Sequence, residues 1–456
     1  MRERNQPASP RFLFAASAAL LAGCSLSPPP PPPGSSTAAR EAVTREAAAG
    51  ANDVAYADKA GSPATPVVDG PISVNDAVTL ALTHHPELAA ARARVESAIG
   101  RKIQAGAFPN PVFSAGMELA PFSGKTSGDA EYPIGVVQTV PIGGRLGKAM
   151  SVEEAREKRL LAEFERQRRE VERQVRGAFG AALFARDTLA VERERFTGAG
   201  EAAQIASDRL AAGDVAADEQ ARADLEMTLA RISLRQAEGS LKRARIELRG
   251  TLGLPELSLE ELEGELEAAL ALPDLKAALA RLEESPVLLA QAAAVEESYA
   301  QVLREEAERI PDIDIGFFYR RLEERSDNAF DVGISMAIPI FDRRQGALQS
   351  ARAERLLAEA EYRKTGLSLA TSLQTVYWKL TEELETAEIF REELLPRSEI
   401  VLRAADERFR AGAVSLAELL PIRREHRDLQ LSYLSLLRQI AMDWAHLRSL
   451  VETVHD

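Results

Sequence analysis

The chain has a single thiol, Cys24, and few other side chains that could act as nucleophiles or as soft metal ligands. One cysteine excludes an intramolecular disulfide and a zinc or iron–sulfur site built from cysteines. The five histidines are scattered, with His84 and His85 expected at an exposed helix end, and the six methionines form no soft-metal cluster. The sequence also contains no nucleophile–base–acid arrangement and no phosphate-binding glycine loop. We therefore expect no enzymatic activity, no cofactor and no dedicated metal site.

Two carboxylates, Glu219 and Glu418, each stand six residues after a glycine, Gly213 and Gly412 respectively. Each glycine ends a long helical pattern, and glycine readily adopts the left-handed backbone that a helix reversal needs. Ser415 and Glu418 have the spacing of a capping box, in which the glutamate only satisfies amides at the start of a helix. Glu219 has no serine or threonine three residues before it, so capping explains Glu219 less well.

The N-terminus has the pattern of an export signal. Arginines precede an apolar run from Phe12 to Ala22, which has the length of a secretory segment and is too short to span a membrane. The run ends in Leu-Ala-Gly before Cys24, which resembles a bacterial lipobox, and Ser25 replaces the aspartate that favours inner-membrane retention. We expect cleavage before Cys24 and attachment of lipid to it. An ordinary signal peptide with an unmodified cysteine is the alternative.

Residues 1–23 are thus predicted to be a lipoprotein signal peptide and residues 24–70 a lipid-anchored linker. The linker contains the proline run Pro28 to Pro33, which favours an extended chain without a core. The formal charge of the whole chain is −14, which argues against binding to nucleic acid. Beyond the N-terminus no apolar run approaches the roughly 20 residues of a spanning helix, which excludes a multi-helix membrane protein. Short alternating strands of a β-barrel are not excluded.

The chain is a tandem duplication. Four landmarks recur in the same order at offsets of 200, 202, 198 and 199 residues: Pro86 with Pro286, Pro109 with Pro311, Pro141 with Pro339, and Gly213 with Gly412. We place the first repeat at residues 71–270 and the second at residues 271–456.

Each repeat is predicted to contain a helix, two strands, a long helix, a tight turn and a final helix. The first helix is expected from Ser73 to before Pro109, and its counterpart from about Asp274 to Ile310. The long helices cover residues 144–212 and 343–411, and each would extend roughly 100 Å. The second contains a coiled-coil-like apolar stripe at Leu369, Leu373, Val376, Leu380 and Leu384. Pro396 in the second, and Thr197-Gly198 in the first, predict a bend about fifteen residues before each turn.

The predicted strands alternate apolar residues with small or polar ones. In the second repeat the apolar positions are Ile313, Ile315, Phe317, Tyr319, Val332, Ile334, Met336 and Ile338. The first repeat shows the pattern more weakly, at Phe113, Ala115, Met117, Leu119, Ile134 and Val136. Such strands suit a sheet between lipid and water, with Asp312, Asp314 and Asp331 toward the water or the loop end. A soluble hairpin packed on a core is the alternative.

Four strands per chain cannot close a barrel, because the smallest membrane barrels have about eight, whereas three copies would supply twelve. With the duplication, this pattern resembles the TolC-like outer-membrane efflux family over nearly all of residues 71–450. The resemblance is carried by Pro141-Ile142-Gly143-Gly144-Arg145, by Ile338-Pro339-Ile340-Phe341-Asp342-Arg343, and by the turn from Arg408 to Leu420.

The resemblance implies a mostly α fold with a small β part, in a trimer whose 12-stranded outer-membrane β-barrel continues into a long periplasmic α-helical barrel. It implies an outer-membrane channel partnered by a periplasmic adaptor protein and an inner-membrane pump of the resistance–nodulation–division type. Gly213 and Gly412 would then lie at the tips that dock the adaptor. Glu418 would correspond to an acidic residue ringing the closed aperture, and Glu219 is the second candidate gate carboxylate.

Within that family, Phe341-Asp342-Arg343-Arg344-Gln345-Gly346 and Asn110-Pro111 look most like the cobalt–zinc–cadmium branch. The resemblance therefore implies a passive conduit that exports heavy-metal cations from the periplasm to the exterior. A multidrug channel, a type I secretion channel, and a lipid-anchored coiled-coil scaffold with soluble hairpins are the alternatives.

Overall fold

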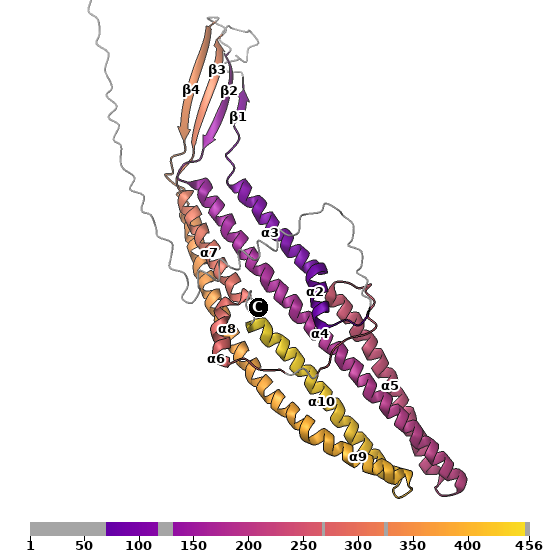
Figure 1. Ribbon diagram of the computed structural model, residues 1–456. Coiled ribbons are helices and arrows are strands. Elements are labelled where there is room, and N and C mark those ends of the chain that lie inside the picture. The colour runs from indigo at the N-terminus through magenta and orange to yellow at the C-terminus, as the bar shows by residue number, and fades with distance from the viewer. Residues whose placement is uncertain (1–69, 117–130, 267–269, 323–326, 452–456) are drawn as a thin grey trace, which may run out of the picture.

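The computed structural model describes residues 70–116, 131–266, 270–322 and 327–451. They form an elongated molecule with a small sheet at one end, a helical body, and two helix hairpins at the other end (Figure 1). The predicted signal peptide, residues 24–69 of the predicted linker including Cys24, and Met117 and Leu119 lie outside the described residues. None of the helices in the described part is both long enough and apolar enough to cross a membrane.

The two repeats have the predicted order of elements. The first contains α2 (Val74–His84), α3 (Pro86–Ala105), β1 (Val112–Ala115), β2 (Glu131–Val140), α4 (Arg145–Ala212) and α5 (Ala217–Leu252). The second contains α6 (Leu275–Arg281), a 3-10 turn (Leu282–Glu284), α7 (Pro286–Ala307), β3 (Ile313–Leu322), β4 (Asp327–Met336), α8 (Gln345–Ile389), a π-helical turn (Phe390–Leu394), α9 (Leu395–Arg410) and α10 (Leu416–Val451).

The prediction of one continuous helix at the start of each repeat is wrong. Ser73 caps α2 as expected, but the helix ends before Pro86, and α6 likewise ends before Pro286. A residue before proline disfavours helical backbone, so His85 and Ser285 are extended and cap the following helices. His85 is only 9% exposed and its Nδ1 accepts the Glu87 amide at 3.3 Å, which corrects the expected exposed position of this residue.

The long helices end as predicted but differ in their interruptions. α4 is continuous over 68 residues, or roughly 100 Å, and its helical structure passes through Thr197-Gly198 without a break. In the second repeat the π-helical turn separates α8 from α9, directly before Pro396. Proline has no N–H to donate, so a wider turn relieves the helix there. The bend expected in this helix therefore coincides with an observed irregularity.

The four strands form one antiparallel sheet in the order β1-β2-β3-β4. The two repeats are joined at its centre, where Phe317 of β3 lies opposite Val136 of β2. The predicted strand positions that lie within the described residues are confirmed, except that Ile338 lies two residues beyond the end of β4.

The helical body is held together by narrow apolar stripes. The coiled-coil-like stripe of α8 is confirmed: Leu369, Leu373, Val376 and Leu380 are buried, and Leu384 is half-buried against the same core. The main core joins helices of both repeats, with Phe179, Leu248 and Leu447 among its largest buried side chains. A second core near the tips contains Ala202, Ala203, Ala206, Ala223, Ala405, Phe409, Leu416 and Leu419.

Candidate functional site

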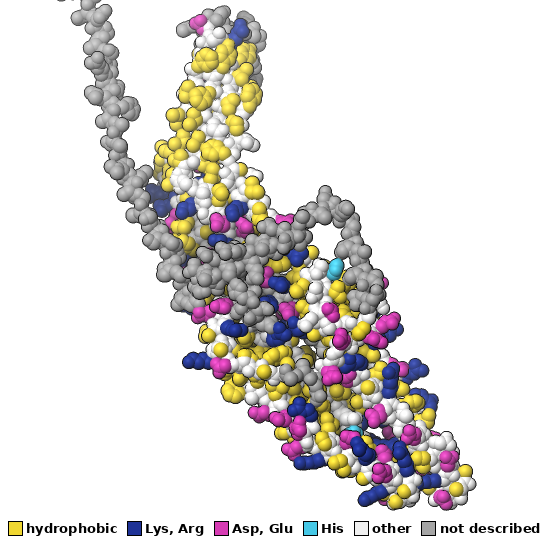
Figure 2. All heavy atoms as spheres, in the orientation of Figure 1, with side chains coloured by type: hydrophobic (Ala, Val, Ile, Leu, Met, Phe, Trp, Pro, Cys, Tyr) yellow, Lys and Arg dark blue, Asp and Glu magenta, His cyan; other side chains and the backbone are white. Residues whose placement is uncertain are grey.

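One face of the sheet is apolar across all four strands. Phe317 lies between Val136 and Val332, and the ring of Tyr319 packs 5.6 Å from that of Phe330, which is 82% exposed. The same face carries Phe113, Ile134, Ile315, Ile334 and Met336. Figure 2 shows hydrophobic side chains over this end of the molecule and charged ones where the sheet meets the helices. An exposed apolar surface of this kind marks contact with lipid or with another protein.

The opposite face of the sheet is mostly small or polar, with Phe318 and Val137 as apolar exceptions. It carries Gly316, Gly333 and Ser335 between the apolar positions. The three acids singled out in the sequence each have a polar partner: Asp314 accepts from Thr139 (2.6 Å), Asp331 pairs with Arg320 (2.9 Å), and Asp312 pairs with Arg145 (2.8 Å) at the start of α4. The sheet therefore separates an apolar surface from a polar one, as the alternation predicted.

The two predicted glycine turns have the same backbone. Gly213 has φ +84° and Gly412 has φ +74°, so both occupy the left-handed region that glycine favours. After each glycine an amide bonds back to the helix, from Asp214 to the Arg209 carbonyl (2.9 Å) and from Ala413 to the Arg408 carbonyl (2.8 Å). Both turns lie at the end of the molecule opposite the sheet (Figure 1).

The two tips are joined by contacts that the sequence analysis did not find. The Arg209 guanidinium lies 5.0 Å from the centroid of the Phe409 ring and donates a hydrogen bond to the Phe409 carbonyl. Arg423 of α10 donates to the Gly198 carbonyl of α4 (2.8 Å) and pairs with Asp406 (2.6 Å). Both arginines therefore tie the long helix of the first repeat to the second repeat.

Glu219 caps a helix of the other repeat. Its carboxylate accepts the Leu416 amide at 3.4 Å, at the start of α10. The Glu418 amide bonds to the Ser415 carbonyl, but the Glu418 side chain is exposed and makes no hydrogen bond or ion pair within the described residues. The capping carboxylate is therefore Glu219, for which the sequence gave the weaker capping signal. No local pattern indicated this contact, because the helix that Glu219 caps lies about 200 residues away in the chain. The reciprocal box expected between Ser415 and Glu418 is not formed.

A cavity of about 420 Å³ lies between the repeats just above the tips, lined by α4, α5, α9 and α10. Its wall is charged and several of the charges are paired: Arg195 pairs with Glu226 (2.8 Å), and Arg424 also approaches Glu226 (3.6 Å). These pairs stabilise the junction of the repeats.

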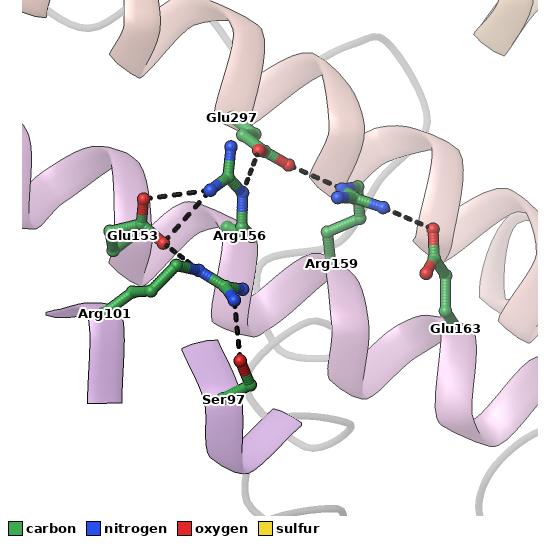
Figure 3. Close-up of polar contacts among 7 residues, drawn as sticks. All are labelled: Ser97, Arg101, Glu153, Arg156, Arg159, Glu163 and Glu297. Atoms are coloured by element: carbon green, nitrogen blue, oxygen red, sulfur yellow. Dashed lines mark hydrogen bonds and ion pairs between the residues drawn. The ribbon is translucent and has the colours of Figure 1, made fainter. Parts of the chain in front are cut away.

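A second polar network fixes the upper body, where α3, α4 and α7 meet (Figure 3). The Glu297 carboxylate of α7 bridges Arg156 (2.8 Å) and Arg159 (2.5 Å) of α4. Arg101 of α3 bonds to Glu153, which also pairs with Arg156. Burial lowers the pKa of Arg159, but the hydrogen bond and charge of Glu297 outweigh it and raise that pKa above its usual value.

A buried acidic pair lies in the helical body. Glu383 of α8 is 9% exposed, and Lys379 pairs with both Glu383 (3.6 Å) and Asp443 of α10 (2.8 Å). Burial raises the pKa of Glu383, and the charge of Asp443 raises it further, to about 7. Leu380 belongs to the buried stripe of α8, and Glu383 follows it by three residues on the same face of the helix. A charged residue at such a core position was the signal in the sequence that could have revealed this acidic pair.

No group of three or more histidine, cysteine or carboxylate side chains with the geometry of a metal site occurs within the described residues.

The chain matches the family described as "Outer membrane efflux protein" over residues 77–254 and 278–452, one segment in each repeat. It is 28% identical over 370 residues to the cobalt-zinc-cadmium resistance protein CzcC of Cupriavidus metallidurans, covering 81% of this chain and 87% of that protein.

Among solved structures, CusC superposes with a TM-score of 0.71 at 16% identity, covering 87% of this chain and 99% of CusC. The outer membrane protein VceC of Vibrio cholerae superposes with a TM-score of 0.70 at 18% identity, covering 84% of this chain and 97% of VceC. At these identities the structures support the fold, and the family match covers most of the chain. The mostly helical fold and the family expected from the motifs are confirmed, and the chain belongs to the outer membrane efflux protein family.

Proposed function

We propose that this chain is the outer-membrane channel of a tripartite efflux pump, a passive conduit that carries heavy-metal cations from the periplasm to the exterior. The observation that carries this proposal is the two-faced sheet mounted on helices roughly 100 Å long. The apolar face meets lipid, the polar face lines the water-filled path, and the helices extend the path across the periplasm. Transport of this kind needs no catalytic step in the channel itself.

The conduit is a homotrimer. One chain supplies four strands, and its sheet ends in two open edges, at β1 and β4. Three chains supply twelve strands, enough to close a wall around a lumen, whereas one chain does not.

Heavy-metal cations are the cargo that the sequence favours. The residues Phe341 to Gly346 resemble the cobalt–zinc–cadmium branch, and CzcC, a relative over 81% of this chain, is a cobalt-zinc-cadmium resistance protein. Asp314, whose partner is the neutral Thr139 hydroxyl, adds negative charge on the side assigned to the lumen, whereas Asp331 is offset by Arg320. The inner-membrane pump, which we place in the resistance–nodulation–division class, selects the ion.

The periplasmic mouth is formed by the hairpin turns at Gly213 and Gly412. These turns dock the periplasmic adaptor, and the carboxylates Glu219 and Glu418 stand beside them. Glu219 is held by the Leu416 amide, which leaves the exposed Glu418 as the carboxylate available to the aperture.

Residues 1–23 are removed as a signal peptide, and lipid on Cys24 anchors the chain to the outer membrane through the linker 24–70. The repeats 71–270 and 271–456 follow. Replacement of Cys24 by serine is expected to abolish labelling with a fatty acid while the chain stays in the membrane fraction. Release of the variant in soluble form would instead support the anchored scaffold.

The test is growth of a deletion strain on zinc, cobalt, cadmium, nickel, copper and several drugs, with and without the intact gene. We expect hypersensitivity to one or more metals, restored by the intact gene. A matched pair of variants tests the lipid face: Ile334→Asp should fail to restore growth, whereas Ser335→Asp, on the opposite face of β4, should restore it. Sensitivity to drugs alone would contradict the metal assignment and leave the conduit.

A further inference from the structure

A phenylalanine stands on the face of the sheet that is otherwise mostly small or polar. Phe318 of β3 lies between Gly135 of β2 and Asp331 of β4 in the register of the strands. It is the largest apolar side chain on this face within the described strands. An aromatic ring on the side assigned to water needs an explanation of its own.

The ring of Phe318 lies across two glycines of the sheet. A Cβ atom placed on Gly316 would lie 2.7 Å from Cε2 of the ring, and one placed on Gly135 would overlap Cδ1. Because Cδ1 and Cε2 are opposite corners of the same ring, the ring spans both glycines and does not stand away from the sheet. Gly135 and Gly316 are both buried, and Phe318 itself is half-buried.

A third glycine of this face is open. Gly333 of β4 lies opposite Gly316, and a Cβ atom placed on Gly333 would meet no atom within 4 Å. Gly333 is also exposed, unlike Gly135 and Gly316. Of these three glycines, the two that Phe318 reaches therefore form a seat for its ring, and the third is bare backbone.

The other large side chain at this height also follows the wall. Arg320 lies opposite Ala329 in the register, yet its guanidinium pairs at 2.9 Å with Asp331, the residue opposite Phe318. The guanidinium therefore reaches diagonally along the sheet. Both large side chains, Phe318 and Arg320, thus leave the space in front of this part of the sheet clear.

We propose that Phe318 sets the bore of the strand-walled part of the channel, meaning the free width of its lumen, and that Gly135 and Gly316 keep this bore wide by holding the ring flat. This proposal rests on the proposed function, in which the polar face lines the lumen of a trimer. Three copies place three rings at the same height around the path. A side chain larger than glycine under the ring lifts each ring into that path.

A stabilising role alone predicts a different result. A ring that covers glycine backbone also packs against the sheet, so its loss would lower the unfolding temperature whether or not the face lines a lumen. The width of the lumen, in contrast, changes only when the ring or its seat borders the path. The test must therefore measure the bore.

The test is planar-bilayer recording of the full-length trimer, with neutral polymers of graded size added on the side of the sheet. Gly316→Ala is the variant of choice, because the three atoms nearest to the added methyl group all belong to the Phe318 ring. Gly135→Ala would also collide with the Phe317 carbonyl. We expect Gly316→Ala to lower the conductance roughly 1.5-fold and to exclude polymers that the unmodified channel admits. The matched control is Gly333→Ala, which adds the same methyl group to the same face away from Phe318 and should change neither quantity.

A double variant isolates the ring. Phe318→Ala should raise the conductance roughly 1.5-fold, and Gly316→Ala should have no further effect in that background, because no ring is left to lift. No change in Gly316→Ala, or an equal loss with and without Phe318, would overturn the proposal. If Gly316→Ala does not assemble, Phe318→Ala decides alone, and an unchanged conductance and polymer cut-off would overturn the role of the ring.

The unmodified protein separates this proposal from the proposed function. An unmodified chain that forms no channel would overturn both. A channel whose bore is the same in the Gly316 and Phe318 variants would overturn the role of Phe318 alone.

Discussion

The guanidinium of Arg209 covers the ring of Phe409 at 5.0 Å and donates to the carbonyl of the same residue, although the two lie 200 positions apart in the chain. Replacement of Arg209 by methionine would keep an apolar stem but remove the charge-dependent contacts. We expect a cost of about 2 kcal/mol at the tips, and about 30-fold faster amide exchange there.

Hydrogen exchange of residues 405–420 followed by mass spectrometry measures this effect. Arg403→Met is the control, because Arg403 is exposed on α9 and, in the part of the chain that the structure describes, pairs only with Glu399 of the same helix. Equal exchange in both variants would show that Arg209 does not hold the tips together.

Glu297 should be the acid on which the contact between α4 and α7 most depends, because it bridges two arginines of α4. Glu297→Gln would remove the negative charge that links the two guanidinium groups of α4 to α7, leaving Arg156 with Glu153 and Arg159 with Glu163 on α4 alone, at a cost of about 2 kcal/mol. Glu163→Gln removes only a partner one turn away from Arg159 on the same helix, so it should cost less than about 0.5 kcal/mol. Thermal unfolding of the detergent-solubilised protein compares the two, and similar losses would contradict the bridging role.

Glu383 should make the helical body less stable as the pH rises. Its pKa is about 7 in the folded protein against 4.5 for the ordinary side chain, so folding favours the protonated form. The stabilisation is complete below pH 4.5 and is lost as the pH rises to about 7, by roughly 2 kcal/mol. Glu383→Gln should remove this dependence, whereas Glu382→Gln, at the exposed neighbouring position, should retain it. Unfolding temperatures measured from pH 4.5 to pH 8 test the sign.

Glu418→Ala should raise the single-channel conductance by roughly twofold and lower the preference for cations, because three carboxylates would leave the mouth. Planar bilayer recordings measure both quantities. Glu418→Gln separates charge from size, and Asp428→Ala, farther along α10 and exposed, is the control. Unchanged conductance in the Glu418 variants would place this residue away from the aperture.

Periodic features could be predicted from the sequence because they record burial along one element. The stripe from Leu369 to Leu380 and the alternation from Ile313 to Tyr319 each reflect a single face, and both are confirmed. The prolines Pro86 and Pro286 were visible as landmarks, yet the helices were predicted to run through them. The local backbone preference before proline outweighed the continuing helical pattern.

Contacts between the repeats could not be predicted in the same way. The approach of Glu219 to the Leu416 amide depends on how two hairpins lie side by side, and no local pattern records that arrangement. The capping-box spacing at Ser415 and Glu418 was a valid local signal, but the box is not formed, and Glu219 of the other repeat accepts a different amide at the same helix start, that of Leu416.

The sheet ends in β1 on one side and β4 on the other, and the helical layer ends in α5 and α9. The two flanks of a chain are therefore different surfaces, so in the proposed trimer copies would associate head to tail, in a heterologous rather than a twofold manner. Each chain then takes part in two contacts between subunits, and a ring closes only when all of these contacts form. A chain altered on one flank would break the rings it enters, and so act as a dominant inhibitor when it is expressed together with normal copies.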